Sequence, residues 1–132
     1  MGVTIKSTDK MEDLSISYSS FNELREAIAL VYDEEFGKGY KEYGDCFRFA
    51  RSEPADCEKI FDNLKEMAKT KHLKASIFNF LWKSDCDGSI SETTCKDLYD
   101  LIKDTDNKYW CWDGFKRVLK YCVENNQGVY WL

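Results

Sequence analysis

Two segments with helical periodicity are joined by Ser84-Asp85-Cys86-Asp87-Gly88-Ser89-Ile90-Ser91, an acidic stretch with a glycine at its centre. The glycine permits a sharp turn at a backbone conformation with positive φ, where a Cβ would be penalised. Ile90 follows as an apolar residue that we expect to point into the core. The stretch therefore predicts two helices joined by an acidic turn in the middle of the chain.

The periodicity of apolar residues predicts further helices on both sides of this turn. The helix before the turn is expected over 71–83 and the one after it begins near Ser91. Another helix opens at Ser52-Glu53-Pro54, because proline is tolerated in a first turn. The last helix runs from about Asp113 to 125–128.

A first helix is predicted from a capping box at Ser20-Phe21-Asn22-Glu23, in which serine and glutamate side chains satisfy backbone donors. Gly37 and Gly39 are interpreted as its end. Residues 40–52 are rich in aromatic side chains, and we expect an irregular segment pressed onto the core.

Both ends of the chain indicate strands. Residues 3–18 alternate in polarity and predict a β-hairpin with its turn at 7–10. The apolar tail 129–132 is expected to add a third strand. The sequence thus predicts one α+β domain over 1–132, with about five helices and a small antiparallel sheet made of the N-terminal hairpin and the C-terminal strand.

The composition narrows the classes of partner and the expected compartment. The net charge of −5 argues against non-specific binding to nucleic acid, which needs a basic surface. No apolar run approaches the roughly 20 residues that span a membrane, and the first residues lack the apolar core of a signal peptide. We therefore expect a cytoplasmic protein with no membrane partner. All six cysteines are then expected to be free thiols: Cys46, Cys57, Cys86, Cys95, Cys111 and Cys122.

Residues 75–102, with the Asp-x-Asp-Gly stretch between two predicted helices, resemble a degenerate EF-hand. The resemblance implies that Asp85 and Asp87 are side-chain ligands of calcium. It implies that Ser89 binds the ion through its backbone carbonyl and Ser91 binds it directly or through water. This reading makes the protein a calcium-binding module.

The same stretch departs from the EF-hand pattern at its two anchoring positions. Lys83 stands where the family has aspartate, and Thr94 stands where it has a bidentate glutamate. One alternative is that the Lys83 ammonium lies against Asp85 and Asp87 and replaces the ion, so that the turn is structural. Another is that the two aspartates and Glu92 face a binding partner or a magnesium ion.

Aromatic residues crowd the start of the last predicted helix. The four consecutive residues Tyr109-Trp110-Cys111-Trp112 cannot all point inward. We expect one tryptophan to be partly exposed in a groove beside 104–108, and Trp and Tyr are typical anchors of protein interfaces. Tyr109, Trp110 and Trp112 are therefore candidate partner-binding residues, together with Asp85, Asp87 and Glu92.

Three short segments carry a second resemblance. The sequences at 17–21, 84–88 and 122–126, followed by the apolar tail, resemble small uncharacterised proteins encoded by bacteria and their phages. The likeness implies a cytosolic accessory role, such as binding or inhibiting a host factor, and no chemistry.

No catalytic motif accompanies these features. The sequence lacks a phosphate-binding loop, a nucleophile elbow and a zinc-protease motif, and it has a single histidine, His72. It therefore favours a non-enzymatic interaction protein with a protein partner and no cofactor. A calcium- or magnesium-binding module is one alternative. A small enzyme or nucleotide-binding protein without a recognisable motif is the other, so a small-molecule ligand stays open.

Overall fold

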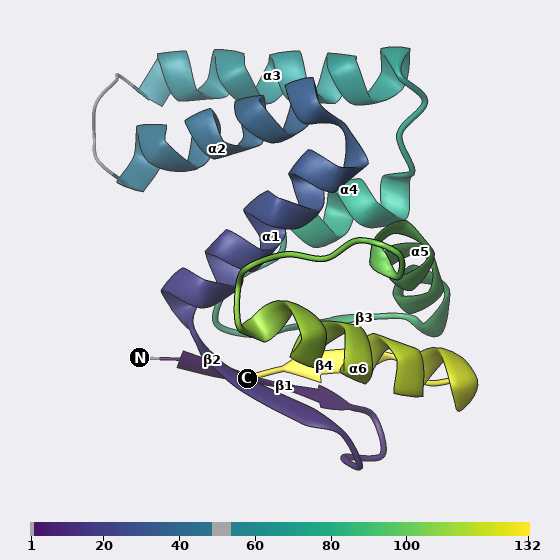
Figure 1. Cartoon of the computed structure of the whole chain (residues 1–132). Coiled ribbons are helices and arrows are strands. Elements are labelled where there is room, and N and C mark those ends of the chain that lie inside the picture. The colour runs from purple at the N-terminus through teal and green to yellow at the C-terminus, as the bar shows by residue number, and fades with distance from the viewer. Residues whose placement is uncertain (1, 49–53) are drawn as a thin grey trace.

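The N-terminal hairpin and the C-terminal tail form one sheet, as the sequence predicts (Figure 1). The structure is a computed structural model that describes residues 2–48 and 54–132. Strands β1 (Gly2–Ser7) and β2 (Asp13–Ser17) pair antiparallel, and β4 (Val129–Trp131) pairs with the other edge of β1. A fourth strand, β3 (Gly88–Ile90), pairs antiparallel with β4. The strand order is therefore β2-β1-β4-β3, and the sequence analysis missed β3.

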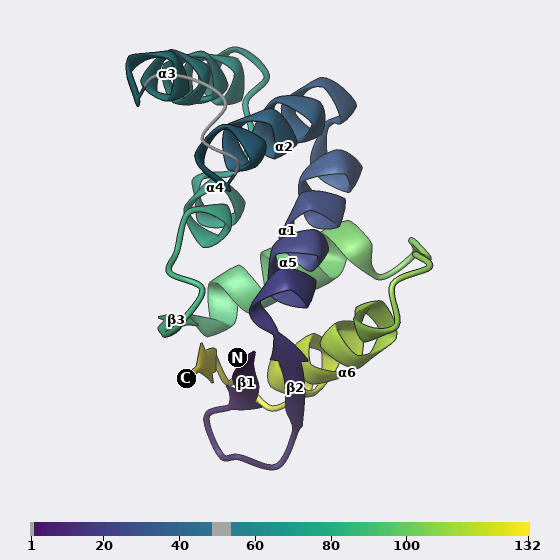
Figure 2. The same ribbon diagram turned by 90° about the vertical axis from the view of Figure 1, so that its left-hand side faces the viewer.

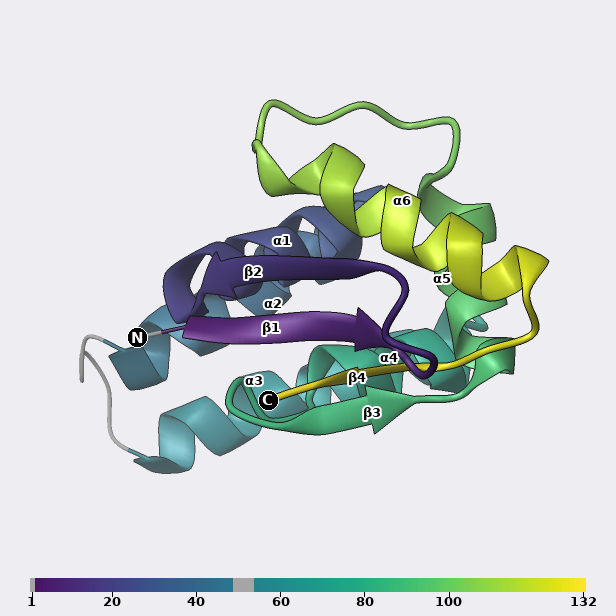
Figure 3. The ribbon, with the colours of Figure 1, turned by 90° about the horizontal axis from the view of Figure 1, so that it is seen from below.

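Residues 2–48 and 54–132 form six helices in addition to this sheet, so the predicted α+β class is confirmed. Helices α1 and α6 pack on the apolar face of the sheet, and α5 packs against both (Figure 1). Figure 3 views the opposite face of the sheet. The helices are α1 (Tyr18–Tyr32), α2 (Glu34–Arg48), α3 (Pro54–Thr70), α4 (Ala75–Leu81), α5 (Glu92–Ile102) and α6 (Cys111–Glu124).

Helix α1 begins one turn before the predicted capping box. The side chain of Ser17 caps it by accepting a hydrogen bond from the Ser20 amide at 3.0 Å. The helix ends at Tyr32 and α2 follows directly, because the Asp33 carboxylate accepts a hydrogen bond from the Phe36 amide at 2.9 Å.

The prediction that residues 40–52 are irregular is wrong as far as the structure describes them, because α2 continues to Arg48. Gly37 and Gly39 lie inside this helix rather than at the end of the first one. Gly37 is required by close packing, since a Cβ there would lie 2.6 Å from the Leu30 Cα. Ser52 and Glu53 of the predicted helix start lie outside the described residues.

The remaining helices follow the predictions with shifted ends. Helix α4 is shorter than the predicted 71–83, and α6 begins two residues before the predicted Asp113. Helix α5 starts where predicted, because the Ser91 side chain accepts a hydrogen bond from the Thr94 amide at 3.3 Å. Figure 2 shows α2 and α3 at the end of the molecule farthest from the sheet.

Candidate functional site

The acidic turn before β3 is built around a buried arginine. The guanidinium of Arg25, from the inward face of α1, pairs with the Asp85 carboxylate and is only 3% exposed. It also donates hydrogen bonds to the Lys83 carbonyl at 2.6 Å and to the Asn22 side chain at 3.2 Å. It also lies over the Phe21 ring, whose centroid is 4.5 Å away. The positive charge inside the turn therefore comes from α1.

This arrangement corrects the prediction that the Lys83 ammonium replaces the calcium ion. Lys83 contributes its backbone carbonyl, and within residues 2–48 and 54–132 its ammonium forms no ion pair. The role of Arg25 was not predicted, because this residue lies 60 positions before Asp85 in the sequence. One signal was present: Arg25 follows Leu24 and precedes Ile28 on the apolar face of a predicted helix, where a charge needs a buried partner.

The four predicted calcium ligands serve other contacts or face solvent. Asp85 accepts hydrogen bonds from the Arg25 guanidinium and from the side-chain amide of Asn22. Ser91 caps α5, whereas Asp87 and the side chain of Ser89 are exposed. Among the described residues, no group of three or more histidine, cysteine, aspartate or glutamate side chains is placed to hold a metal. Calcium binding at this turn stays a prediction.

The C-terminal strand, and not a left-handed glycine, fixes the shape of the turn. The prediction of a positive φ at Gly88 is wrong. Gly88 is required because a Cβ would lie 2.4 Å from the Trp131 ring. The indole of Trp131 also donates a hydrogen bond to the Ser84 carbonyl at 3.0 Å. Ile90 is buried, as predicted.

An exposed thiol lies on the same turn. Cys86 is exposed, and its hydrogen bond with Tyr18, together with the negative charge of Asp85, raises the pKa of Tyr18.

A cleft of about 450 Å³ opens beside the Arg25–Asp85 pair. Its opposite wall is aromatic, formed by Tyr40 and Tyr43 of α2 and by Trp82. The rings are edge-to-face, with centroids 5.2 Å apart for Tyr40 and Trp82 and 4.8 Å apart for Tyr43 and Trp82. Burial raises the pKa of Tyr43. The cleft thus combines a rigid apolar wall with a polar one.

The stretch before α6 exposes one tryptophan, as predicted. Trp110 is 66% exposed, whereas Trp112 is fully buried. The Trp112 indole donates a hydrogen bond to the Thr105 carbonyl at 2.8 Å, and the Lys116 ammonium donates to the same oxygen at 3.1 Å. Trp112 is thus a structural residue, and its place among the candidate partner-binding residues is corrected.

Trp110 and Tyr109 border different hollows. Trp110 lines a hollow of about 450 Å³ against strands β1 and β2. Tyr109, half-buried, lines another of about 430 Å³ with Ala27 and Leu30 of α1. The hollow beside 104–108 is the one that Tyr109 lines, so the prediction that the exposed tryptophan lies in that groove is wrong.

The acidic turn and the exposed tryptophan do not form one surface. In Figure 2 the turn before β3 and the segment before α6 lie on opposite sides of α1. Asp85 lines one hollow and Trp110 another, and the two hollows share no lining residue.

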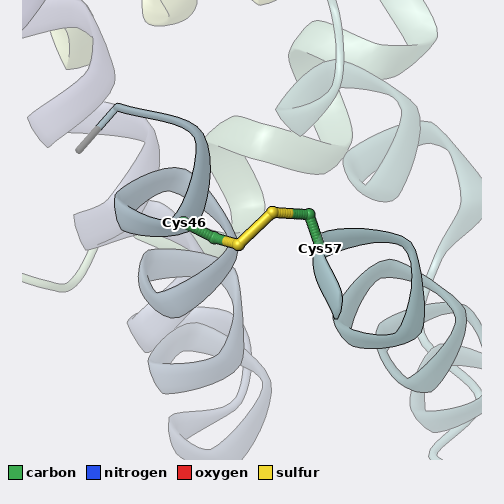
Figure 4. The surroundings of a disulfide bond; sticks show 2 residues. All are labelled: Cys46 and Cys57. Atoms are coloured by element: carbon green, nitrogen blue, oxygen red, sulfur yellow. A yellow bond between two sulfur atoms is a disulfide. The ribbon is translucent and has the colours of Figure 1, made fainter. Parts of the chain in front are cut away.

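The cysteines differ from the prediction of six free thiols. Cys46 at the end of α2 and Cys57 in the first turns of α3 form a disulfide (Figure 4). Their spacing matches no familiar motif, and the prediction rested on the expected compartment alone. Four cysteines are free; of these, Cys86 is exposed and the others are buried.

Comparisons with family models, with curated proteins and with solved structures find no match to this chain. Among the helices that the structure describes, none has both the length and the apolar character required to cross a membrane.

Proposed function

We propose that this protein is a non-enzymatic interaction protein and that Trp110 is the anchor of its binding surface. The observation that carries the proposal is the 66% exposure of Trp110 next to a fully buried Trp112. Large exposed aromatic side chains are enriched among the residues that contribute most to protein interfaces.

The neighbouring contacts support the choice of Trp110. The side chains of Trp112 and Lys116 in α6 donate hydrogen bonds to the Thr105 carbonyl, which ties the loop that leads to Trp110 to this helix. A side chain presented from a fixed backbone loses less conformational freedom on binding, which favours affinity. The hollow between Trp110 and the strands offers space for a side chain of the partner.

The proposed setting is the cytoplasm of a bacterial cell. The likeness to small bacterial and phage-encoded proteins supports a host factor as the partner, with inhibition of that factor as the accessory role. Tyr109 borders the proposed surface, whereas Asp87 and Glu92 are expected to contribute little, because the acidic turn lines a different hollow from Trp110.

A comparative pull-down tests the proposal. The wild-type protein, Trp110→Ala and Leu132→Ala are immobilised and exposed to bacterial lysate, and captured proteins are quantified by mass spectrometry. Leu132 is the matched control, because it is 75% exposed and lies at the chain end. We expect a specific protein to be retained by the wild type and the control, and to be reduced at least about tenfold by Trp110→Ala, as an interface anchor predicts.

The captured protein is then purified and titrated by calorimetry. Equal binding of all three immobilised proteins would contradict the role of Trp110, provided that their melting temperatures agree. Titration of calcium, magnesium and nucleotides in the same instrument tests the two alternative functions.

A further inference from the structure

Helix α2 has a sequence that does not favour a helix. It contains Gly37, Gly39 and Gly44, and glycine is the least favourable residue in a helix interior apart from proline. Its stability must therefore come from contacts with other elements. The first half has such contacts: Asp33 caps it, and the Tyr40 hydroxyl donates a buried hydrogen bond to the Leu81 carbonyl at 2.8 Å.

From Gly39 onward α2 packs against α3, and Tyr43 also contacts Trp82, with ring centroids 4.8 Å apart. A Cβ at Gly39 would lie 2.7 Å from the Leu64 side chain, so the glycine lets the two helices approach closely. Farther along, the Tyr43 and Phe61 ring centroids are 5.7 Å apart, and the Cys46–Cys57 disulfide joins the helices at their ends.

Helix α3 is held at both ends by different bonds. At its C-terminal end, the Lys71 ammonium contacts the Asp33 carboxylate at 2.8 Å and the Glu35 carboxylate at 3.1 Å. At its N-terminal end the covalent bond is the disulfide (Figure 4). Figures 1 and 2 place this helix on the outside of the molecule, beyond α2 and away from the sheet.

We propose that the Cys46–Cys57 disulfide is a redox latch for the cleft between α1, α2 and α4. In the oxidised protein it holds the second half of α2 against α3 and keeps Tyr43 and Gly44 in the cleft wall. In the reduced protein this half of α2 and the first turns of α3 open, and the sheet and its helices stay folded.

The chemistry is thiol–disulfide exchange with a dithiol reductant. One reductant thiolate attacks a sulfur of the disulfide, forms a mixed disulfide and releases the other cysteine as a thiolate, which takes up a proton. The second reductant thiol resolves the mixed disulfide. The protein gains two electrons and two protons and the reductant becomes a disulfide. Cys46 is 6% and Cys57 2% exposed, so the attack requires the helix ends to open first.

The latch matters for the cellular setting. A reducing cytoplasm favours the open form, whereas an oxidising environment favours the closed form. The state of this one bond therefore decides whether Tyr43 completes the aromatic wall that Tyr40 and Trp82 begin.

Hydrogen exchange measured by mass spectrometry tests the latch. The test protein carries Cys86→Ser, which removes the exposed thiol that could exchange with the disulfide. Adding dithiothreitol should accelerate amide exchange at least about tenfold in segments 41–48 and 54–61, because opening exposes their backbone. Exchange in β1, β4 and α6 should not change. Oxidised glutathione should restore the original rates after the dithiol is removed.

The variant Cys46→Ser/Cys57→Ser in the same background is the matched control. It should exchange like the reduced protein and should not respond to dithiothreitol. Equal exchange in oxidised and reduced protein would overturn the proposal, because the helices would then be docked without the bond. Acceleration in every segment would also overturn it, since the bond would then stabilise the whole fold. So would a count of six thiols in denatured, unreduced wild-type protein, where the disulfide leaves four.

Discussion

Replacing Asp85 with alanine tests the physical role of the acidic turn. The substitution leaves the Arg25 guanidinium, which is 3% exposed, without its counter-ion. Removing one partner of a buried ion pair destabilises a protein by about 3–5 kcal/mol. The hydrogen bonds of Arg25 to Lys83 and Asn22 and its contact with Phe21 remain. We therefore expect a loss of about 3 kcal/mol, at the lower end of that range.

Replacing Arg25 with methionine should be less harmful. The charge that remains is then Asp85, whose side chain is 37% exposed and can be hydrated. Methionine keeps most of the apolar packing, so the loss is mainly that of hydrogen bonds, each worth about 1 kcal/mol. We expect a loss of about 1–2 kcal/mol. The double variant should resemble Arg25→Met, because neither leaves a buried charge.

Urea unfolding followed by circular dichroism measures these differences. With a slope of about 1–3 kcal/mol per molar urea, a loss of 3 kcal/mol lowers the midpoint by roughly 1–3 M. The order of stability is the decisive result. If Arg25→Met is as unstable as Asp85→Ala or less stable, the buried arginine is not the charge that the turn neutralises.

Three further predictions concern the C-terminal strand, Gly88 in the acidic turn and Asp9 in the turn of the N-terminal hairpin. Deleting 129–132 removes the strand between β1 and β3, together with the buried Trp131, and should prevent cooperative thermal unfolding of the sheet. Gly88→Ala should lower stability in urea by about 1–3 kcal/mol, the usual cost of overpacking, whereas the exposed Ser89→Ala should not. The Asp9 pKa is lowered, chiefly by a hydrogen bond from the Tyr121 hydroxyl, so its contribution to stability is complete above about pH 4 and declines below it. Asp9→Asn should therefore lose less stability than the wild type between about pH 4 and pH 2 in an acid titration.

The elements that the sequence predicted are those with local signals. Alternating polarity specifies the hairpin and the tail strand, because successive side chains of a strand face opposite sides. Ser91 marks the start of α5 because a capping hydrogen bond joins residues only three apart. The exposure of one tryptophan followed from crowding among four consecutive aromatic and apolar residues, and the structure showed that it is Trp110 and not Trp112.

The tertiary structure alone decided the features that depend on residues far apart in the chain. Asp85 forms an ion pair with Arg25, and position 88 has to be glycine because a Cβ there would collide with the Trp131 ring. Helix α2 forms although its three glycines disfavour a helix, because α3 and a disulfide support it. Local patterns follow from backbone geometry over a few residues, whereas charge pairing, close approach and cross-linking depend on which distant segments the fold brings into contact.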